Sequence, residues 1–282
     1  MINWFLRQKT SNIDSRLLQL VEVQQANKVL FSLFTRYGDT IINLMVIKEF
    51  IEQYPDKEYL ILCPRQMEPY VNELLPNITC LPLNKRNIFD LMKANKLLKN
   101  WIPDIGFNPW SNGVESCFFL TYCKRFFCYK YFDKPKVINH YEVVRLYLGL
   151  KKTIWKINEL CPNKKYEKVL ICPESTDDRR SITLQSLDKI LLKLQDYCPL
   201  QITIAAMNKV YEEESFSFFK FKKNEKSSND FIRLVKQSDI VIAVDSAPLH
   251  IALAFNKKVI PIFRITEPKI VLNTGISYIK NL

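Results

Sequence analysis

The chain has only 5 glycines, 2 histidines and no long apolar run, and each shortage excludes a class of protein. The loop after its first apolar strand holds one glycine, so the G-x-G-x-x-G pattern of a nicotinamide-binding fold is missing. Two histidines, His140 and His250, cannot build a His-rich metal site. The start of the chain lacks the features of a signal peptide, and no run is long enough to span a membrane. We therefore expect a cytoplasmic protein without a His-rich metal site.

The eight cysteines form no C-x-x-C pair, and several lie inside apolar runs. This pattern favours small core residues in a reducing compartment over disulfides or a zinc site. The cysteines are Cys63, Cys80, Cys117, Cys123, Cys128, Cys161, Cys172 and Cys198.

The net charge of +12 is spread over both halves of the chain. An even spread indicates neither a basic tail nor a recognition stripe. The positive charge has two alternative explanations, which are drift in base composition and ligands rich in phosphate. No zinc-finger, RNP or helix-turn-helix pattern accompanies the charge, so nucleic acid is not an expected partner.

The length of 282 residues favours two domains, and the apolar runs indicate an α/β fold. A run typical of a buried parallel strand covers 28–34, a loop follows, and helical spacing begins at Thr40. A second unit opens at Lys168 and a third at Ser238. The polar stretch 156–168 is the best linker candidate, so the domains are expected to be 1–155 and 156–282.

Two further segments need an interpretation. Residues 1–26 carry one apolar helical stripe, which predicts a helix added to the first domain; its members are Ile13, Leu17, Leu18 and Val21. A membrane-surface contact through Trp4, Phe5 and Arg7 is the alternative. The segment 212–230 has mixed charge and is expected to be an exposed connection and not a domain of its own.

Ligand crevices of doubly wound domains lie at the carboxyl ends of the strands, and the loops there contain the candidate residues. Asp39 follows Gly38 at a helix start, where a carboxylate either caps the helix or faces a substrate. Asp245 and Ser246 follow a strand and are expected to supply N-capping oxygens. The start of a helix over 248–255 then forms an anion site suited to a diphosphate. His250 on that helix is either a buried, satisfied histidine or a ligand contact.

At this point the sequence resembles a known family. The run SDIVIAVDSAPLHIALAFNKKVIPIF (238–263) is similar to the donor-site signature of glycosyltransferase family 9, the lipopolysaccharide heptosyltransferases. Residues 28–55 resemble that family's opening strand, G-D loop and first helix, and 103–110 its third strand region. Residues 139–150 resemble its interdomain helix, and 175–183 its basic loop.

The resemblance implies a GT-B fold, with two Rossmann-like doubly wound domains facing a central cleft. It also implies an inverting, metal-independent transfer of a heptose or related sugar from a nucleotide donor, with ADP-heptose as the candidate. The acceptor would be a lipopolysaccharide, lipooligosaccharide or other cell-surface saccharide, which suggests peripheral contact with the inner face of the cytoplasmic membrane. Oligomeric state, donor base and linkage stay open.

The resemblance also assigns roles to individual residues. Asp39 matches the catalytic base, and Arg179 matches the basic residue that stabilises the leaving diphosphate. Arg180 is its substitute and a donor contact. The other donor-side positions are Glu212 or Glu213, Asp245, Ser246, Ala247 and His250, and the acceptor-side loop is Arg36, Tyr37 and Gly38.

The chain departs from the family pattern at several places. Ala247 and Arg264 stand where the family usually has glycine, and an aromatic residue beside the basic loop is missing. Relatives usually continue beyond residue 268 through a closing helix. These departures keep a second class open, a non-catalytic relative that binds a nucleotide or a saccharide.

Overall fold

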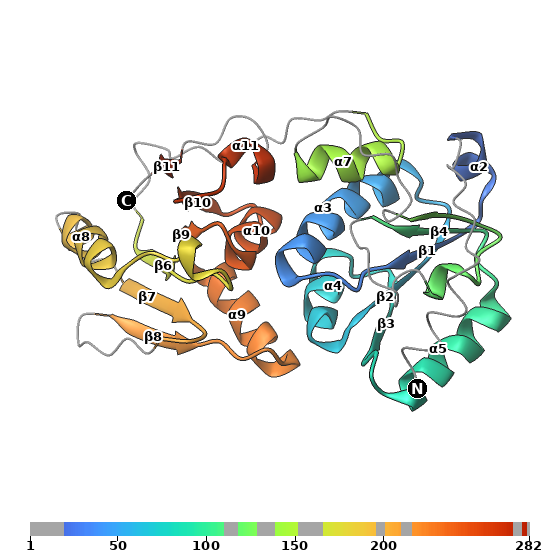
Figure 1. The fold of residues 1–282 in the computed structure, drawn as a ribbon, viewed down its shortest axis with the longest axis horizontal. Coiled ribbons are helices and arrows are strands. Elements are labelled where there is room, and N and C mark those ends of the chain that lie inside the picture. The colour runs from blue at the N-terminus through green and yellow to red at the C-terminus, as the bar shows by residue number, and fades with distance from the viewer. Residues whose placement is uncertain are drawn as a thin grey trace. The chain divides into compact units, whose positions relative to one another are not determined.

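The computed structural model describes residues 20–109, 118–128, 139–151, 166–195, 201–209, 216–272 and 278–280. The chain divides into two compact units, one of residues 1–137 and 141–152 and the other of residues 138–140 and 153–282 (Figure 1). Within the described residues, no helix is both long and apolar enough to cross a membrane.

Unit 1 is a parallel five-stranded sheet covered by helices, with strand order β3-β2-β1-β4-β5. Its strands are β1 (Lys28–Ser32), β2 (Glu58–Pro64), β3 (Thr79–Leu83), β4 (Ile105–Asn108) and β5 (Arg125–Cys128). Its helices are α2 (Leu20–Gln25), α3 (Tyr37–Gln53), η1 (Arg65–Met67), α4 (Glu68–Leu74), α5 (Ile88–Trp101) and most of α7 (His140–Tyr147).

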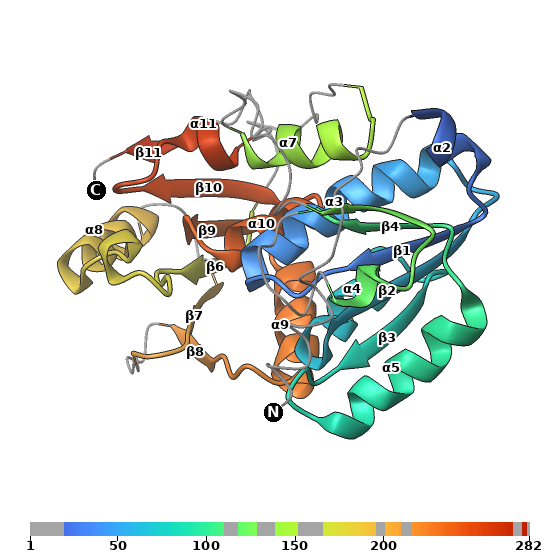
Figure 2. The same ribbon diagram turned by 45° about the vertical axis from the view of Figure 1, so that its right-hand side comes forward.

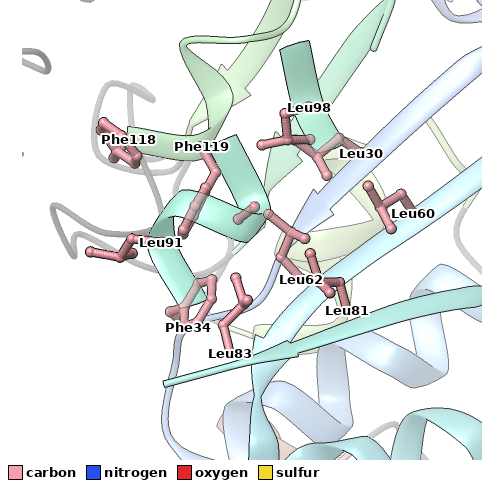
Figure 3. Packing of buried hydrophobic residues seen from close by; sticks show 11 residues of the cluster. Leu30, Phe34, Leu60, Leu62, Leu81, Leu83, Leu91, Leu98, Phe118 and Phe119 are labelled. Atoms are coloured by element: carbon pink, nitrogen blue, oxygen red, sulfur yellow. The ribbon is translucent and has the colours of Figure 1, made fainter. Parts of the chain in front are cut away.

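The two faces of this sheet carry different cores, because successive side chains of a strand point to opposite faces. On one face Leu30 belongs to a hydrophobic cluster with residues of α5, as Figure 3 shows. On the other face Phe31 stacks on Phe107, with 5.5 Å between ring centroids, and meets Phe50 of α3 edge to face. Leu30 and Phe31 are both fully buried, as the continuous apolar run at 28–34 predicts.

Two close contacts hold further segments on unit 1. Arg145 of α7 is fully buried and forms a bidentate ion pair with Glu49 of α3, at 2.7 and 3.0 Å. Gly106 of β4 leaves room for the segment 118–123, since an added Cβ would lie 2.4 Å from Cys123 Sγ and 2.8 Å from Leu120 Cδ2. A side chain at residue 106 would force the side chains of Cys123 and Leu120 to move.

Unit 2 is a parallel six-stranded sheet of order β11-β10-β9-β6-β7-β8 (Figure 2). Its strands are β6 (Lys168–Cys172), β7 (Gln201–Ala206), β8 (Ser217–Lys220), β9 (Ile240–Val244), β10 (Lys258–Phe263) and β11 (Ile279–Lys280). Its helices are η3 (Asp178–Arg180), α8 (Leu184–Gln195), α9 (Glu225–Gln237), α10 (Ala247–Ala254) and α11 (Pro268–Val271). Buried residues of α8 pack on one face, among them Leu187 and Leu191.

Two expectations for secondary structure are wrong. The helix after β1 begins at Tyr37, so Gly38 and Asp39 lie in its first turn and not in the loop. Thr40 anchors this earlier start, because its N–H and its hydroxyl both donate to the carbonyl of Arg36. The segment 212–230 is not merely a connection, because its described part contains β8 and the start of α9. Phe218 and Phe219 of β8 complete the sheet despite the charged residues around them.

Candidate functional site

In both units the strand order reverses beside the first strand of the sheet. Unit 1 runs from β1 outward to β3 and then crosses to β4. Unit 2 repeats this path from β6 to β8 and crosses to β9. Ligands of such sheets bind at the carboxyl ends of the two strands where the order diverges. The loops after β1 and β4, and those after β6 and β9, are therefore the places to search.

The loop after β6 is closed by its own polar groups. Ser181 Oγ accepts the N–H of Ser175 at 2.9 Å, and the N–H of Ile182 donates to the carbonyl of Pro173 at 3.0 Å. Asp177 caps the short helix η3 by accepting the N–H of Arg179. The loop therefore holds its two arginines on a short, hydrogen-bonded turn.

Arg179 and Arg180 make different ion pairs. Arg179 forms a bidentate pair with Asp177 of its own loop, at 2.8 and 3.0 Å, and its side chain is 77% exposed. Hydrogen bonds and charge from Arg179 lower the pKa of Asp177 to about 2. Arg180 Nη1 instead donates to Asp245 Oδ2 at 3.2 Å, and its side chain is 23% exposed. Of the two, Arg180 is the one that reaches the loop after β9.

Asp245 joins three loops of unit 2 through one buried carboxylate. Its Oδ2 accepts from Arg180 on the loop after β6 and from the hydroxyl of Thr266 on the loop after β10, the latter at 2.6 Å. Its own N–H donates to the carbonyl of Ile262. A buried carboxylate needs such donors, since an uncompensated charge in the interior is costly. The carboxyl ends of β6, β9 and β10 are thus tied together.

Helix α10 starts directly after this carboxylate, but the expected side-chain caps are absent. Ser246 is the N-cap residue, and its hydroxyl donates to the carbonyl of Val244 and makes no capping bond. Asp245 is turned to Arg180 and Thr266 instead, because those donors compete for its oxygens. The first turn has Ala247 and then Pro248, which has no N–H to satisfy. The side chain of the N-cap residue therefore does not bond the free N–H groups at the positive end of the helix dipole.

Both histidines of the chain are buried in unit 2, where His250 interacts with Asp245 and His140 with His250. Burial lowers the pKa of His250 to about 4; Asp245 acts in the opposite direction and Arg180 adds to the lowering. Burial and the neighbouring His250 also hold the pKa of His140 well below its usual value. His250 is therefore a neutral imidazole at physiological pH, suited to hydrogen bonding and not to neutralising a phosphate.

Two residues near these loops carry contacts that the sequence gave no signal for. Glu174 is buried, and its carboxylate accepts three successive N–H groups after β7, from Met207, Asn208 and Lys209, at 2.7 to 2.9 Å. Arg264, at the end of β10, donates from Nη1 to the carbonyl of Ser181 at 2.6 Å. Both contacts join strands distant in sequence, so no local pattern reveals them.

In unit 1 the predicted loop residues surround the start of α3. Arg36 is the N-cap residue and is exposed, while Tyr37, Gly38 and Asp39 are half-buried in the first turn. Asp39 therefore does not occupy the N-cap position. A carboxylate in this turn is still favoured by the helix dipole. Thr35 hydrogen-bonds Thr40 across the same turn, with 2.7 Å between their hydroxyl oxygens.

Some sequence predictions fall on parts of the chain that the structure does not describe. Glu212 and Glu213 lie outside the described residues, as do Trp4, Phe5 and Arg7.

Among the residues that are described, no group of three or more His, Cys, Asp and Glu side chains is arranged to hold a metal ion.

Comparison with known proteins agrees with the resemblance. Residues 226–277 match the sequence profile of Glycosyltransferase family 9 (heptosyltransferase). This stretch contains β9, α10 and β10, and so Asp245, Ser246 and His250. No curated protein sequence matches the chain.

Three similar solved structures have related folds. ADP-heptose lps heptosyltransferase II of E. coli is 14% identical with a TM-score of 0.64, and the match covers 89% of this chain and 92% of that one. Heptosyltransferase WaaC of E. coli with ADP is 12% identical, with the same coverage and TM-score. The iron-containing TibC of enterotoxigenic E. coli, in complex with ADP-D-beta-D-heptose, is 11% identical with a TM-score of 0.57, covering 90% of this chain and 62% of that one.

The predicted fold class is confirmed. Each unit is a doubly wound parallel sheet, and 89% of the chain matches the fold of a GT-B heptosyltransferase. The predicted resemblance to glycosyltransferase family 9 is confirmed by the profile match in unit 2. The profile match supports a glycosyltransferase activity, and the similar structures support the fold.

The buried state of His250 predicts how stability depends on pH. Its folded pKa of about 4 lies below the unfolded value of about 6.5, so between these values the unfolded chain binds a proton at this residue and the folded chain does not. The free energy of unfolding is therefore highest above about pH 6.5 and decreases as the pH falls toward 4. Near pH 5, His250 should account for a loss of roughly 2 kcal/mol in urea unfolding relative to neutral pH. The buried His140 adds to this loss, because its pKa is lowered too. His250→Gln should shrink that loss; an equal loss in both proteins would exclude His250 as its source.

Proposed function

We propose that this chain, whose residues 226–277 match glycosyltransferase family 9, transfers a heptose or related sugar from a nucleoside-diphosphate donor to a saccharide acceptor. The observation that carries the proposal is the arrangement at the switch point of unit 2. There Asp245, which lies inside the matched segment and directly before Ser246, the N-cap residue of α10, binds the guanidinium of Arg180 through its carboxylate.

The donor half of the proposal assigns the diphosphate to this switch point. The positive end of α10 attracts a phosphate, and its first N–H groups are the natural donors to phosphate oxygens. Arg180 and Arg179 supply guanidinium groups, which bind phosphates with two parallel hydrogen bonds. Ser246 and His250 add a hydroxyl and a neutral imidazole. Ala247 keeps the helix start small, and Glu212 is assigned to the nucleoside.

The similar structures make ADP-heptose the first donor to try. E. coli WaaC was solved with ADP, and TibC with ADP-D-beta-D-heptose. We propose an adenine nucleotide sugar for this chain on that basis. The acceptor is proposed to be a lipopolysaccharide or lipooligosaccharide core or another cell-surface saccharide, which would be reached on the inner face of the cytoplasmic membrane.

The acceptor half of the proposal assigns the chemistry to unit 1. Asp39 takes the proton from an acceptor hydroxyl while the oxygen of that hydroxyl forms a bond to the anomeric carbon of the donor sugar. The bond from that carbon to the diphosphate oxygen breaks at the same time, so the configuration inverts. The departing charge is stabilised by Arg179, Arg180 and the start of α10. Arg36, Tyr37 and Gly38 belong to the acceptor side of this unit.

Variants of the two arginines test the donor half. We expect Arg180→Gln to weaken binding of ADP by about tenfold or more, because a charge-assisted hydrogen bond contributes about 1.5–3 kcal/mol. Arg179→Gln should have a smaller effect, since its guanidinium is exposed and paired with Asp177. Arg233→Gln is the matched control, because Arg233 of α9 is also exposed and paired with an aspartate. Calorimetry that finds the same affinity in all four proteins would remove both arginines from the donor site.

Asp39→Asn tests whether the chain is an enzyme or a binding relative. The amide keeps the size of the side chain, but it cannot accept the proton, so turnover should fall by about 10²–10⁴. The melting temperature should change little, because the amide keeps the size of the side chain and the lost interaction of the charge with the start of α3 contributes only about 0.3–1 kcal/mol. Turnover of ADP-heptose is measured beside the melting temperature and ADP affinity. Near wild-type turnover would exclude Asp39 as the base, and binding without any turnover in the wild type would favour the non-catalytic relative.

Metal independence is tested by chelation. If guanidinium groups and the helix start stabilise the leaving diphosphate, turnover should survive EDTA. The question is open because TibC, of similar fold, is iron-containing. Turnover that EDTA abolishes and that magnesium, manganese or iron restores would show that a metal takes part, with Asp177 and Asp178 as the first ligands to examine.

A further inference from the structure

The outer face of α5 in unit 1 combines exposed apolar side chains with a cluster of cations. Phe89 is 76% exposed, Met92 60% and Ile88 48%, and all three lie in the first turns of the helix. Large apolar side chains usually turn inward, so three neighbours in contact with water mark an interaction surface. Helical spacing places Phe89 and Met92 on one side of the helix, away from the buried residues Leu91, Ala94 and Leu98.

Exposed cations surround these three side chains. Two precede the helix in the loop after β3, and three continue along its outward face; they are Lys85, Arg86, Lys93, Lys96 and Lys99. The one acidic residue of α5, Asp90, does not offset them. It is buried, and its carboxylate accepts two bonds from Arg65, at 2.8 and 2.9 Å, and the N–H of Asn84. The charge that solvent meets on this face is therefore positive.

The loop before α5 is fixed by its own hydrogen bonds. Asn87 caps the helix by accepting the N–H of Phe89 at 2.9 Å, and Asn84 accepts the N–H of Arg86 at 3.1 Å. The N–H of Asn87 also donates to the carbonyl of Asn84. These bonds hold the loop cations beside the apolar side chains, so little ordering is needed when a partner binds.

We propose that this α5 surface, formed by Ile88, Phe89, Met92 and the five cations around them, docks the protein on an anionic lipid membrane. Apolar side chains that enter the headgroup region, with Lys and Arg around them, are the features that bind an interfacial helix to such a membrane. Each cation near an anionic surface strengthens binding by about fivefold, so the five cations add to the affinity that the apolar side chains supply.

A second copy of the chain fits this surface less well. A two-fold contact would bring the surface against itself and place like charges opposite one another. Three apolar side chains also provide far less than the roughly 800 Å² per partner of a standard interface. An anionic membrane has neither problem, since its charge is complementary and its apolar region accepts isolated side chains.

The test is binding of the full chain to vesicles, measured by co-sedimentation. Wild-type protein should bind vesicles of phosphatidylcholine mixed with phosphatidylglycerol, and should bind pure phosphatidylcholine vesicles weakly or not at all. Added salt should weaken the binding, because it screens the cations. Absence of binding to the anionic vesicles would overturn the proposal.

Two double variants locate the contact. Lys85→Glu with Arg86→Glu should lower the vesicle affinity by more than about tenfold, and Phe89→Ser with Met92→Ser by about tenfold. Leu192→Ser with Lys193→Glu is the matched control, since both residues are exposed on α8 of unit 2. It should bind vesicles as the wild type does.

The same variants separate this proposal from its competitors. All should keep the wild-type melting temperature and ADP affinity, because the substituted side chains lie in solvent and outside the proposed donor site. Equal vesicle binding by wild type and both α5 variants would move the contact elsewhere and overturn the proposal. So would a loss of self-association in the α5 variants without a change in vesicle binding, because the surface would then join two copies of the chain. Failure of ADP binding in the wild type would instead count against the donor site alone.

Discussion

Parallel strands cannot be joined by tight turns, and this constraint organises both units. Each connection must cross over the sheet, so every strand enters from the same edge and ends at the opposite one. Once strands have been added to the sheet on one side of the first strand, the chain crosses back and adds the next strands on the other side. The return separates two neighbouring loops, after β1 and β4 in unit 1 and after β6 and β9 in unit 2. All the candidate residues that the structure describes lie on these loops, on the helices that follow them or beside them just after β10.

The fold could be predicted where burial leaves a continuous apolar run. Residues of β1, β6 and β9 are buried on both faces, so their sequences contain few polar side chains and mark the strands directly. The edge strand β8 was missed because its burial is partial and its neighbours are charged. The start of α3 was placed three residues late, because its first turn is fixed by Thr40 and Arg36 and not by apolar spacing.

The candidate site was predictable only in part, and the reason is the range of its contacts. The loops could be found, because they follow recognisable strands. The partner of each side chain could not, since Arg180 and Asp245 are 65 residues apart and Glu174 meets backbone groups 33 to 35 residues away. The same limit applies to Asp245, whose expected role as a helix cap gives way to two donors from other loops.

The shared carboxylate of Asp245 has a consequence for how these loops tolerate mutation. Removing Arg180 leaves the carboxylate with Thr266, and removing Thr266 leaves it with Arg180, so either loss is partly offset by the donor that stays. Removing both leaves a buried charge without either of them. The combined cost should therefore exceed the sum of the separate costs, as is usual for residues in one hydrogen-bonded network. Positions 180, 245 and 266 form one epistatic unit, in which the acceptable residue at each depends on the other two.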